Sequence, residues 1–174
     1  AGLTLERGAG RRVAEVSEAS RKRAAAAAAR IAREDGVVSI APADLSALWA
    51  RRAEENVALL DVRTREEYEE GHVAGAAWAP GGQAVQATDE YIAVRAARVV
   101  LVCDGSGRSI MTAAWLKRMG LPGVSVLAGG LPAWQAGGGA VETGHPDPEP
   151  WGYAAARATA YAWQAAAAMA RESR

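Results

Sequence analysis

The sequence predicts an α/β fold with a mainly parallel central sheet and helices on both of its faces. Short apolar runs that suit buried strands alternate along the chain with amphipathic segments that suit helices. The 174 residues are enough for one domain with a substantial core and some additional chain. Functional residues are expected at the carboxyl ends of the strands, because sheets of this kind bind their ligands there.

The first predicted element is an alanine-rich helix. It begins after Ser17, a good capping residue, and stops at Gly36. We therefore expect residues 1–36 to be an N-terminal extension that carries this helix. The domain itself is expected over residues 37–140, and a glycine run marks its end. Residues 141–174 are expected to form a proline-rich linker and a C-terminal helix.

Four strands are predicted within the domain, because their apolar runs are short and bounded by turn residues. They cover residues 37–40, 57–62, 98–102 and 124–127. Helices are predicted over residues 42–52, 64–69, 89–94, 108–119 and 132–136. Pro42 suits the first turn of a helix, and Thr64 with Glu67 forms a capping box. Residues 72–87, rich in glycine and alanine, are expected to form a loop.

The most informative stretch follows the predicted strand at residues 98–102. It starts with the only cysteine of the chain, Cys103, passes through two glycines to Arg108, and leads into a helix. Helix N-termini and glycine-rich loops direct backbone N–H groups at a ligand, so a thiolate or persulfide on Cys103 would be stabilised there. A buried structural cysteine is the alternative. The glycines and Arg108 favour a reactive one.

The length of this loop indicates which group it holds. Four residues separate Cys103 from Arg108. Tyrosine-phosphatase-like loops, which hold a tetrahedral phosphate, have five residues there and usually a histidine before the cysteine, where this chain has Val102. The shorter loop suits a terminal sulfur atom better than a phosphoryl group. A phosphatase or arsenate reductase is therefore the less favoured interpretation.

Three motifs resemble the signatures of the rhodanese family of sulfurtransferases. Residues 60–63 with 67–76 resemble the first signature, residues 103–109 the active-site loop, and residues 129–137 the closing signature. Together they cover about residues 38–138 in the family's order and spacing. Residues 78–89 resemble a subgroup with several rhodanese domains in one chain. That resemblance implies neighbouring rhodanese domains as partners in a longer chain.

The resemblance implies a sulfurtransferase that works through a cysteine persulfide. Cys103 would attack the outer sulfur of a donor such as thiosulfate, and a thiol or cyanide would then accept that sulfur. The persulfide is covalent, so no separate cofactor is expected. The residues implied to bind the substrate are Asp104, Gly105, Ser106, Gly107, Arg108 and Ser109. Their amides would stabilise negative charge on sulfur, Arg108 would hold the loop or meet the anionic donor, and Ser109 would cap the helix.

Two departures from the family's usual loop bear on the activity. Ser106 stands where the family often has glycine, and glycines flank it at 105 and 107. Asp104 places a carboxylate beside the nucleophile, where it would repel a dianionic donor. We therefore expect poor turnover of thiosulfate. A non-catalytic rhodanese-like module that binds a partner or regulates neighbouring domains remains the alternative.

Three polar residues outside the loop are expected to support it. Asp61 and Arg63 are interpreted as a structural pair at the end of a strand, bracing the loop, rather than as catalytic groups. His72 is interpreted as a hydrogen-bonded structural histidine rather than a general base.

Composition excludes several other classes of function. Twenty basic and 20 acidic residues give a formal net charge of zero, which offers no electrostatic footprint for nucleic acid. No apolar run is long enough to span a membrane, and no cluster has the spacing of metal ligands, so neither a membrane nor a metal is expected. The lone cysteine suits a reducing compartment, and we expect a cytoplasmic protein.

Overall fold

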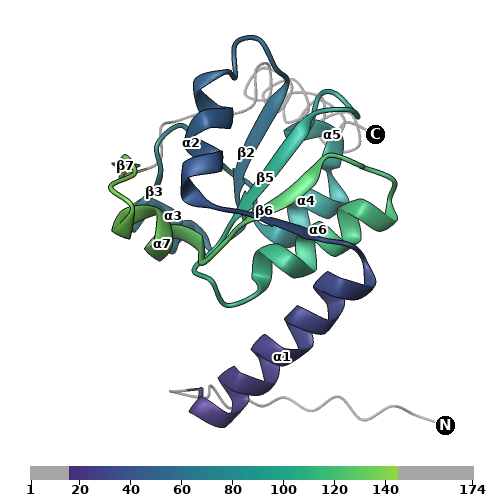
Figure 1. Cartoon of the computed structure of the whole chain (residues 1–174), viewed down its shortest axis with the longest axis vertical. Coiled ribbons are helices and arrows are strands. Elements are labelled where there is room, and N and C mark those ends of the chain that lie inside the picture. The colour runs from purple at the N-terminus through teal and green to yellow at the C-terminus, as the bar shows by residue number, and fades with distance from the viewer. Residues whose placement is uncertain (1–15, 145–174) are drawn as a thin grey trace, which may run out of the picture.

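A five-stranded parallel sheet lies at the centre of the computed structural model, which describes residues 16–144 (Figure 1). The strand order is β1-β6-β5-β2-β4. The strands are β1 (Val38–Ile40), β2 (Val57–Asp61), β4 (Ala77–Trp78), β5 (Arg98–Val102) and β6 (Val124–Leu127). Each neighbouring pair in the sheet is parallel. The predicted fold class and four predicted strands are confirmed, with ends that differ by at most one residue.

The central strand β5 is buried on both faces, and its side chains alternate between two apolar clusters. Val99 and Leu101 pack in one cluster with Ala113 and Leu116 of the helix that follows. Val100 and Val102 pack in the other cluster, with residues of the helices on the opposite face. This alternation has the period of two that a strand imposes, so the sheet needs a helical layer on each side.

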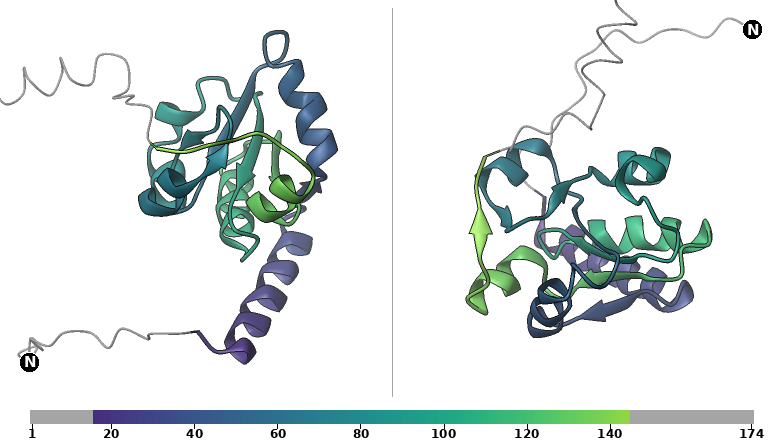
Figure 2. Two further views of the ribbon diagram at one scale, coloured as in Figure 1. Left: turned by 90° about the vertical axis from the view of Figure 1, so that its left-hand side faces the viewer. Right: turned by 90° about the horizontal axis from the view of Figure 1, so that it is seen from above.

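The two helical layers are visible in Figures 1 and 2. The first cluster lies under α4 (Gly81–Gln86), α5 (Thr88–Tyr91) and α6 (Arg108–Arg118). The second lies under α2 (Pro42–Ala50) and α7 (Gly130–Ala136). After β2 comes α3 (Arg65–Glu70), whose N-terminus has the predicted capping box of Thr64 and Glu67. None of the helices within residues 16–144 is long and apolar enough to cross a membrane.

The helix before the sheet, α1 (Glu18–Glu34), starts after Ser17 as predicted, and the Ser17 hydroxyl accepts a hydrogen bond from the Ser20 N–H at 3.2 Å. It packs against α6 (Figure 1), where Ala28 is its buried residue. Arg118 at the end of α6 donates to the Asp35 carboxylate at 2.8 and 2.9 Å. The helix α1 is therefore attached to the outer helical layer of the domain.

The prediction of a loop over residues 72–87 was wrong. This segment holds β3 (His72–Val73), the edge strand β4 and α4. Strands of two residues cannot show alternation in a sequence, so only pairing reveals them. β3 pairs antiparallel with β7 (Val141–Glu142), across the predicted domain end at residue 140. The predicted C-terminal helix lies outside the described residues.

Candidate active site

The site lies at the carboxyl edge of the sheet, where the chain leaves two neighbouring strands. Asp61, the last residue of β2, is in register with Val102, the last residue of β5. The Val62 N–H donates to the Val102 carbonyl at 3.0 Å, so the two strand ends stay together beyond the ladder. The segments that follow β2 and β5 therefore meet, and Cys103 starts the second of them.

The Cys103 side chain lies inside the protein, with 1% of its surface exposed. It belongs to the same apolar cluster as Val62 and Ala79. Its sulfur lies 3.2 Å from the hydroxyl oxygen of Ser109, which is itself buried in the first turn of α6. The three residues after the cysteine are exposed. The thiol thus lies below the surface, and the loop that follows it forms that surface.

Two details of the loop differ from the prediction. Ser109 does not cap α6, because Gly107 takes the capping position and makes no side-chain cap bond. Ser109 is instead the second residue of the helix, two positions after the cap, and its hydroxyl lies next to the cysteine sulfur. Within residues 16–144, that hydroxyl is the hydrogen-bond partner of the sulfur, and the N–H of Ser106 donates to Asp104 at 3.0 Å. In this part of the chain, no ring of backbone amides donates to the Cys103 sulfur, unlike the arrangement expected from the sequence.

Both glycines of the loop have a left-handed backbone. Gly105 and Gly107 have φ values of +83° and +103°, a region that glycine adopts without steric cost. A third glycine holds the loop from outside: a Cβ on Gly130 would collide with the Cys103 carbonyl and the Gly105 nitrogen. The next N–H, of Leu131, donates to the Cys103 carbonyl at 2.8 Å. The closing motif therefore packs directly on the cysteine loop.

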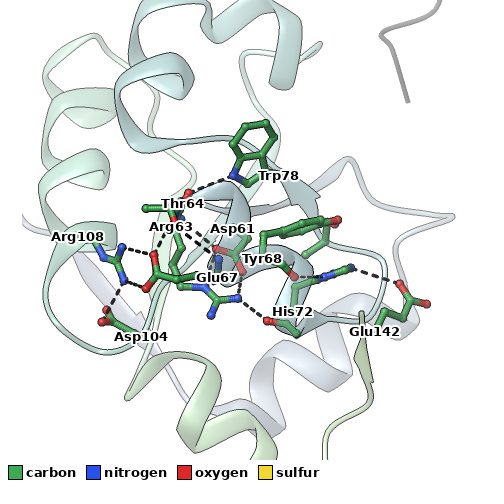
Figure 3. A network of polar contacts seen from close by, with 12 residues as sticks. Asp61, Arg63, Thr64, Glu67, Tyr68, His72, Trp78, Asp104, Arg108 and Glu142 are labelled. Carbon is green, nitrogen blue, oxygen red and sulfur yellow. Dashed lines mark hydrogen bonds and ion pairs between the residues drawn. The ribbon is translucent and has the colours of Figure 1, made fainter. Parts of the chain in front are cut away.

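Arg108 is tied to two carboxylates (Figure 3). Its Nη1 and Nη2 donate to the two carboxylate oxygens of Glu67 at 2.7 and 2.6 Å, and Nη2 lies 3.0 Å from Asp104. Bidentate pairs of this kind are strong and directional. Arg108 thus holds the loop against α3, which is one of the two roles expected of it. Glu67 was predicted as a helix cap only, and the sequence carries no signal for its contact with a residue 41 positions away.

These contacts set the ionisation of the three groups. The pKa of Glu67 is lowered from 4.5 to about 2, chiefly by the hydrogen bonds from Arg108 and against the effect of burial. Burial tends to raise the pKa of Asp104, but hydrogen bonds from Ser106 and the ion pair with Arg108 outweigh it and lower that pKa. The pKa of Arg108 is raised, first by Glu67. All three are charged at neutral pH, so the cluster carries one net negative charge.

Asp61 and Arg63 form a buried ion pair behind this cluster. They are 0% and 6% exposed, and Arg63 contacts the Asp61 carboxylate through Nε at 2.9 Å and Nη2 at 2.7 Å. Arg63 Nη2 also donates to the Gly71 carbonyl at 2.6 Å. The pair is therefore structural, but these contacts connect the end of β2 to the end of α3 and not to the cysteine loop that it was expected to brace.

His72 lies at the far side of the polar network from Arg108 (Figure 3). Its ring is fully buried and stacks on Tyr68, with centroids 3.6 Å apart. Nδ1 lies 2.8 Å from the Tyr68 carbonyl, and Nε2 lies 3.8 Å from Glu142 without a hydrogen-bond partner among the described residues. These contacts place His72 in the junction of α3, β3 and β7. Over residues 16–144, no three His, Cys, Asp or Glu side chains are grouped so that they could hold a metal ion.

Known proteins resemble the chain over the same region. A family model described as "Rhodanese-like domain" matches residues 44–137. A crystal structure of thiosulfate sulfurtransferase from Pseudomonas aeruginosa shares 42% identity and a TM-score of 0.68, and it covers 84% of this chain and 27% of that chain. Thiosulfate sulfurtransferase 16, chloroplastic, of Arabidopsis thaliana is 30% identical over 89 residues, which cover 45% of this chain and 74% of that protein.

A further relative is SseB of Mycobacterium tuberculosis, whose name describes it provisionally as a thiosulfate sulfurtransferase. It is 32% identical over 142 residues, which cover 66% of this chain and 49% of SseB. The chain thus spans about half the length of this relative. The family model alone covers more than half of the 174 residues, and the matched region contains the cysteine loop. This chain therefore belongs to the family of rhodanese-like domains.

Proposed function

We propose that this chain is a sulfurtransferase that carries sulfane sulfur on Cys103. The observation that carries the proposal is the placement of the thiol. It lies at the carboxyl end of the central strand, next to a buried hydroxyl and under a loop with two left-handed glycines. The names of the relatives support the same activity. We further propose that neighbouring rhodanese-like domains accompany this one, which the greater length of SseB supports.

The first half-reaction loads the cysteine. The Cys103 thiolate attacks the outer sulfur of thiosulfate, the bond between the two thiosulfate sulfurs breaks, and its electron pair leaves with sulfite. The product is a Cys103 persulfide. Ser109 is placed to assist, because a thiolate cannot donate and the hydroxyl at 3.2 Å must then be the donor. Donation to the charged sulfur stabilises the Cys103 thiolate, which is the form that attacks the donor and the form that returns after unloading.

The second half-reaction removes the sulfur from the Cys103 persulfide. A nucleophile such as cyanide or a thiolate attacks the outer sulfur of the persulfide, and the sulfur–sulfur bond breaks. The electron pair returns to the Cys103 sulfur, which is again a thiolate. Cyanide gives thiocyanate, and a thiol gives its persulfide. Neither step calls for a metal or a separate cofactor.

The charges near the loop bear on the choice of donor. From the sequence, Asp104 was expected to repel a dianion. Its carboxylate forms an ion pair with Arg108, which partly neutralises its charge. Glu67 takes up the rest of the arginine's charge. The cluster therefore has no spare cation for the dianion thiosulfate, so we propose that thiosulfate is turned over poorly and that a persulfide or a mercapto-acid, with less negative charge, is the better donor.

The second candidate is a non-catalytic rhodanese-like module, which the burial of Cys103 favours. Intact-mass measurement separates the two. The protein is incubated with thiosulfate, desalted and weighed, beside Cys103→Ser. The enzyme gains one sulfur atom, loses it to cyanide, and the variant gains none. A wild-type mass that stays unchanged after prolonged incubation with thiosulfate and with an organic persulfide would support the module instead.

A further inference from the structure

An open groove with a volume of about 590 Å³ lies beside the cysteine loop, between α4 and α6. Its walls include Val62, Gly82, Val85, Arg108, Met111 and Trp115. Nothing in the reaction described above uses this groove. Its size suits a small organic ligand, because such sites enclose several hundred cubic ångströms in proteins.

The outer wall of the groove is apolar and exposed. Met111 and Trp115 lie one helical turn apart on α6, and 43% and 52% of their surfaces are exposed. Arg118 lies over the Trp115 ring, 5.5 Å from its centroid, and restricts the orientation of the indole. Covering large exposed apolar side chains with an apolar group of a ligand lowers the free energy, because apolar surface is removed from water. The groove therefore favours a ligand with an aromatic or aliphatic body.

The groove adjoins the end of the cysteine loop. Arg108 belongs both to the groove and to the loop that starts at Cys103. Val62 belongs both to the groove and to the apolar cluster that contains the Cys103 side chain. A ligand in the groove would therefore have one end next to Arg108, where the cysteine loop ends.

The charge at that near end selects against anions. Arg108 is the charged residue of the groove wall, and its guanidinium already faces Glu67 and Asp104. The three side chains together carry one net negative charge. A carboxylate on the ligand would be repelled there, whereas an uncharged ligand would not. Charge and apolarity thus indicate the same chemical class.

We propose that this groove is the acceptor site and that it binds a small, uncharged organic thiol with an apolar body. The inference rests on the proposed function and specifies its second half-reaction. The bound thiol loses its proton to water, the resulting thiolate attacks the outer sulfur of the Cys103 persulfide, the sulfur–sulfur bond breaks, and its electron pair returns to Cys103. The product is the organic persulfide.

Gly82 offers a way to fill the groove without disturbing the fold. A Cβ at this position has no atom within 4 Å, and the Gly82 φ is not among the positive ones. Gly82→Leu therefore adds a side chain to the groove wall at no backbone cost. Gln83→Leu is the matched control, because Gln83 is the next exposed residue of the same helix and is not part of the wall.

The test compares acceptors on protein preloaded with sulfur. Benzyl mercaptan is the apolar thiol, 4-(mercaptomethyl)benzoate its anionic counterpart, and cyanide a small acceptor with no need of the groove. We expect Gly82→Leu to lower the ratio of the benzyl mercaptan rate to the cyanide rate about tenfold, a loss of ~1.4 kcal/mol, and Gln83→Leu to leave that ratio within about twofold. An unchanged ratio in Gly82→Leu, or equal rates with the two benzyl thiols, would overturn the proposal.

A binding measurement separates failure of this inference from failure of the proposed function. Benzyl methyl sulfide cannot accept sulfur, so its binding is independent of catalysis. The indole N–H resonance of Trp115 is identified as the one that is missing from the spectrum of Trp115→Phe. Benzyl methyl sulfide should shift this resonance. It should also bind about tenfold more weakly to Gly82→Leu. If the protein shows this binding but fails to transfer sulfur, the groove is confirmed as a binding site for apolar ligands and the proposed sulfurtransferase activity is refuted. Absence of binding refutes the groove in either case.

Discussion

Removing the charge of Glu67 should change how stability depends on pH. Glu67→Gln keeps a side chain that can complete the capping box with Thr64 but loses the ion pair with Arg108. In the native protein the pKa of Glu67 is about 2, against an ordinary 4.5. Because the folded pKa is the lower one, the ionised carboxylate stabilises the fold above about pH 4.5, and this contribution is lost as the pH falls toward 2.

The size of this effect follows from the same numbers. Lowering the pKa from 4.5 to about 2 corresponds to about 3 kcal/mol at neutral pH. The Glu67 side chain is 33% exposed, so solvent screening reduces the expected contribution to about 1–2 kcal/mol. Urea unfolding measures the free energy of unfolding of both proteins at about pH 5 and pH 2. Between these pH values, the wild type should lose about 1–2 kcal/mol more than Glu67→Gln loses.

A neighbouring residue gives the matched control. Glu66 lies in the same first turn of α3 and is exposed. Glu66→Gln should therefore follow the wild-type pH dependence. Identical pH dependence in the wild type and Glu67→Gln would refute the claim that the Arg108 ion pair stabilises the native loop.

Three further substitutions test the packing and chemistry of the loop. Gly130→Ala should destabilise the protein by about 2 kcal/mol or more in urea, because its Cβ collides with the backbone around Cys103. Arg63→Met leaves Asp61 buried without its partner, and thermal and urea unfolding should show a loss of about 3–5 kcal/mol. Ser109→Ala removes a donor to charged sulfur, and single-turnover kinetics with thiosulfate should show persulfide formation slowed about tenfold or more.

Two controls make these results specific. Gly138 also has a positive φ, of +76°, but a Cβ there meets nothing within 4 Å. Gly138→Ala therefore carries the backbone strain alone, and an equal loss of stability in both glycine variants would contradict the collision at residue 130. Ser106→Ala removes an exposed hydroxyl from the same loop. If it slows persulfide formation as much as Ser109→Ala, the sulfur contact is not the cause.

The sequence predicted those parts of the fold that rest on local pattern. β5 was recognisable because four consecutive apolar residues, Val99–Val102, end at a turn, and its burial on both faces follows from its place in the middle of the sheet. The capping box at α3 was recognisable from Thr64 and Glu67 alone. The two-residue strands β3, β4 and β7 were not, because pairing with distant residues creates them.

The site was predictable to a lesser degree, because its contacts are tertiary. Cys103 and its loop were identified from the motif, but the depth of the thiol depends on packing by Val62 and Ala79. Ser109 was expected to cap the helix, and its true contact depends on where the glycines turn the chain. Glu67 was assigned one role from its local spacing, while its bond to Arg108 joins two elements that only the folded sheet brings together.

The central claim concerns one sulfur atom on one side chain, and isotope tracing follows that atom. Thiosulfate labelled only in its outer sulfur is mixed with the protein, the Cys103 peptide is isolated, and cyanide is then added to a second sample. The label should appear on the Cys103 peptide first and in thiocyanate afterwards. Thiocyanate that carries label while Cys103 never does, or label retained by Cys103→Ser, would contradict the account.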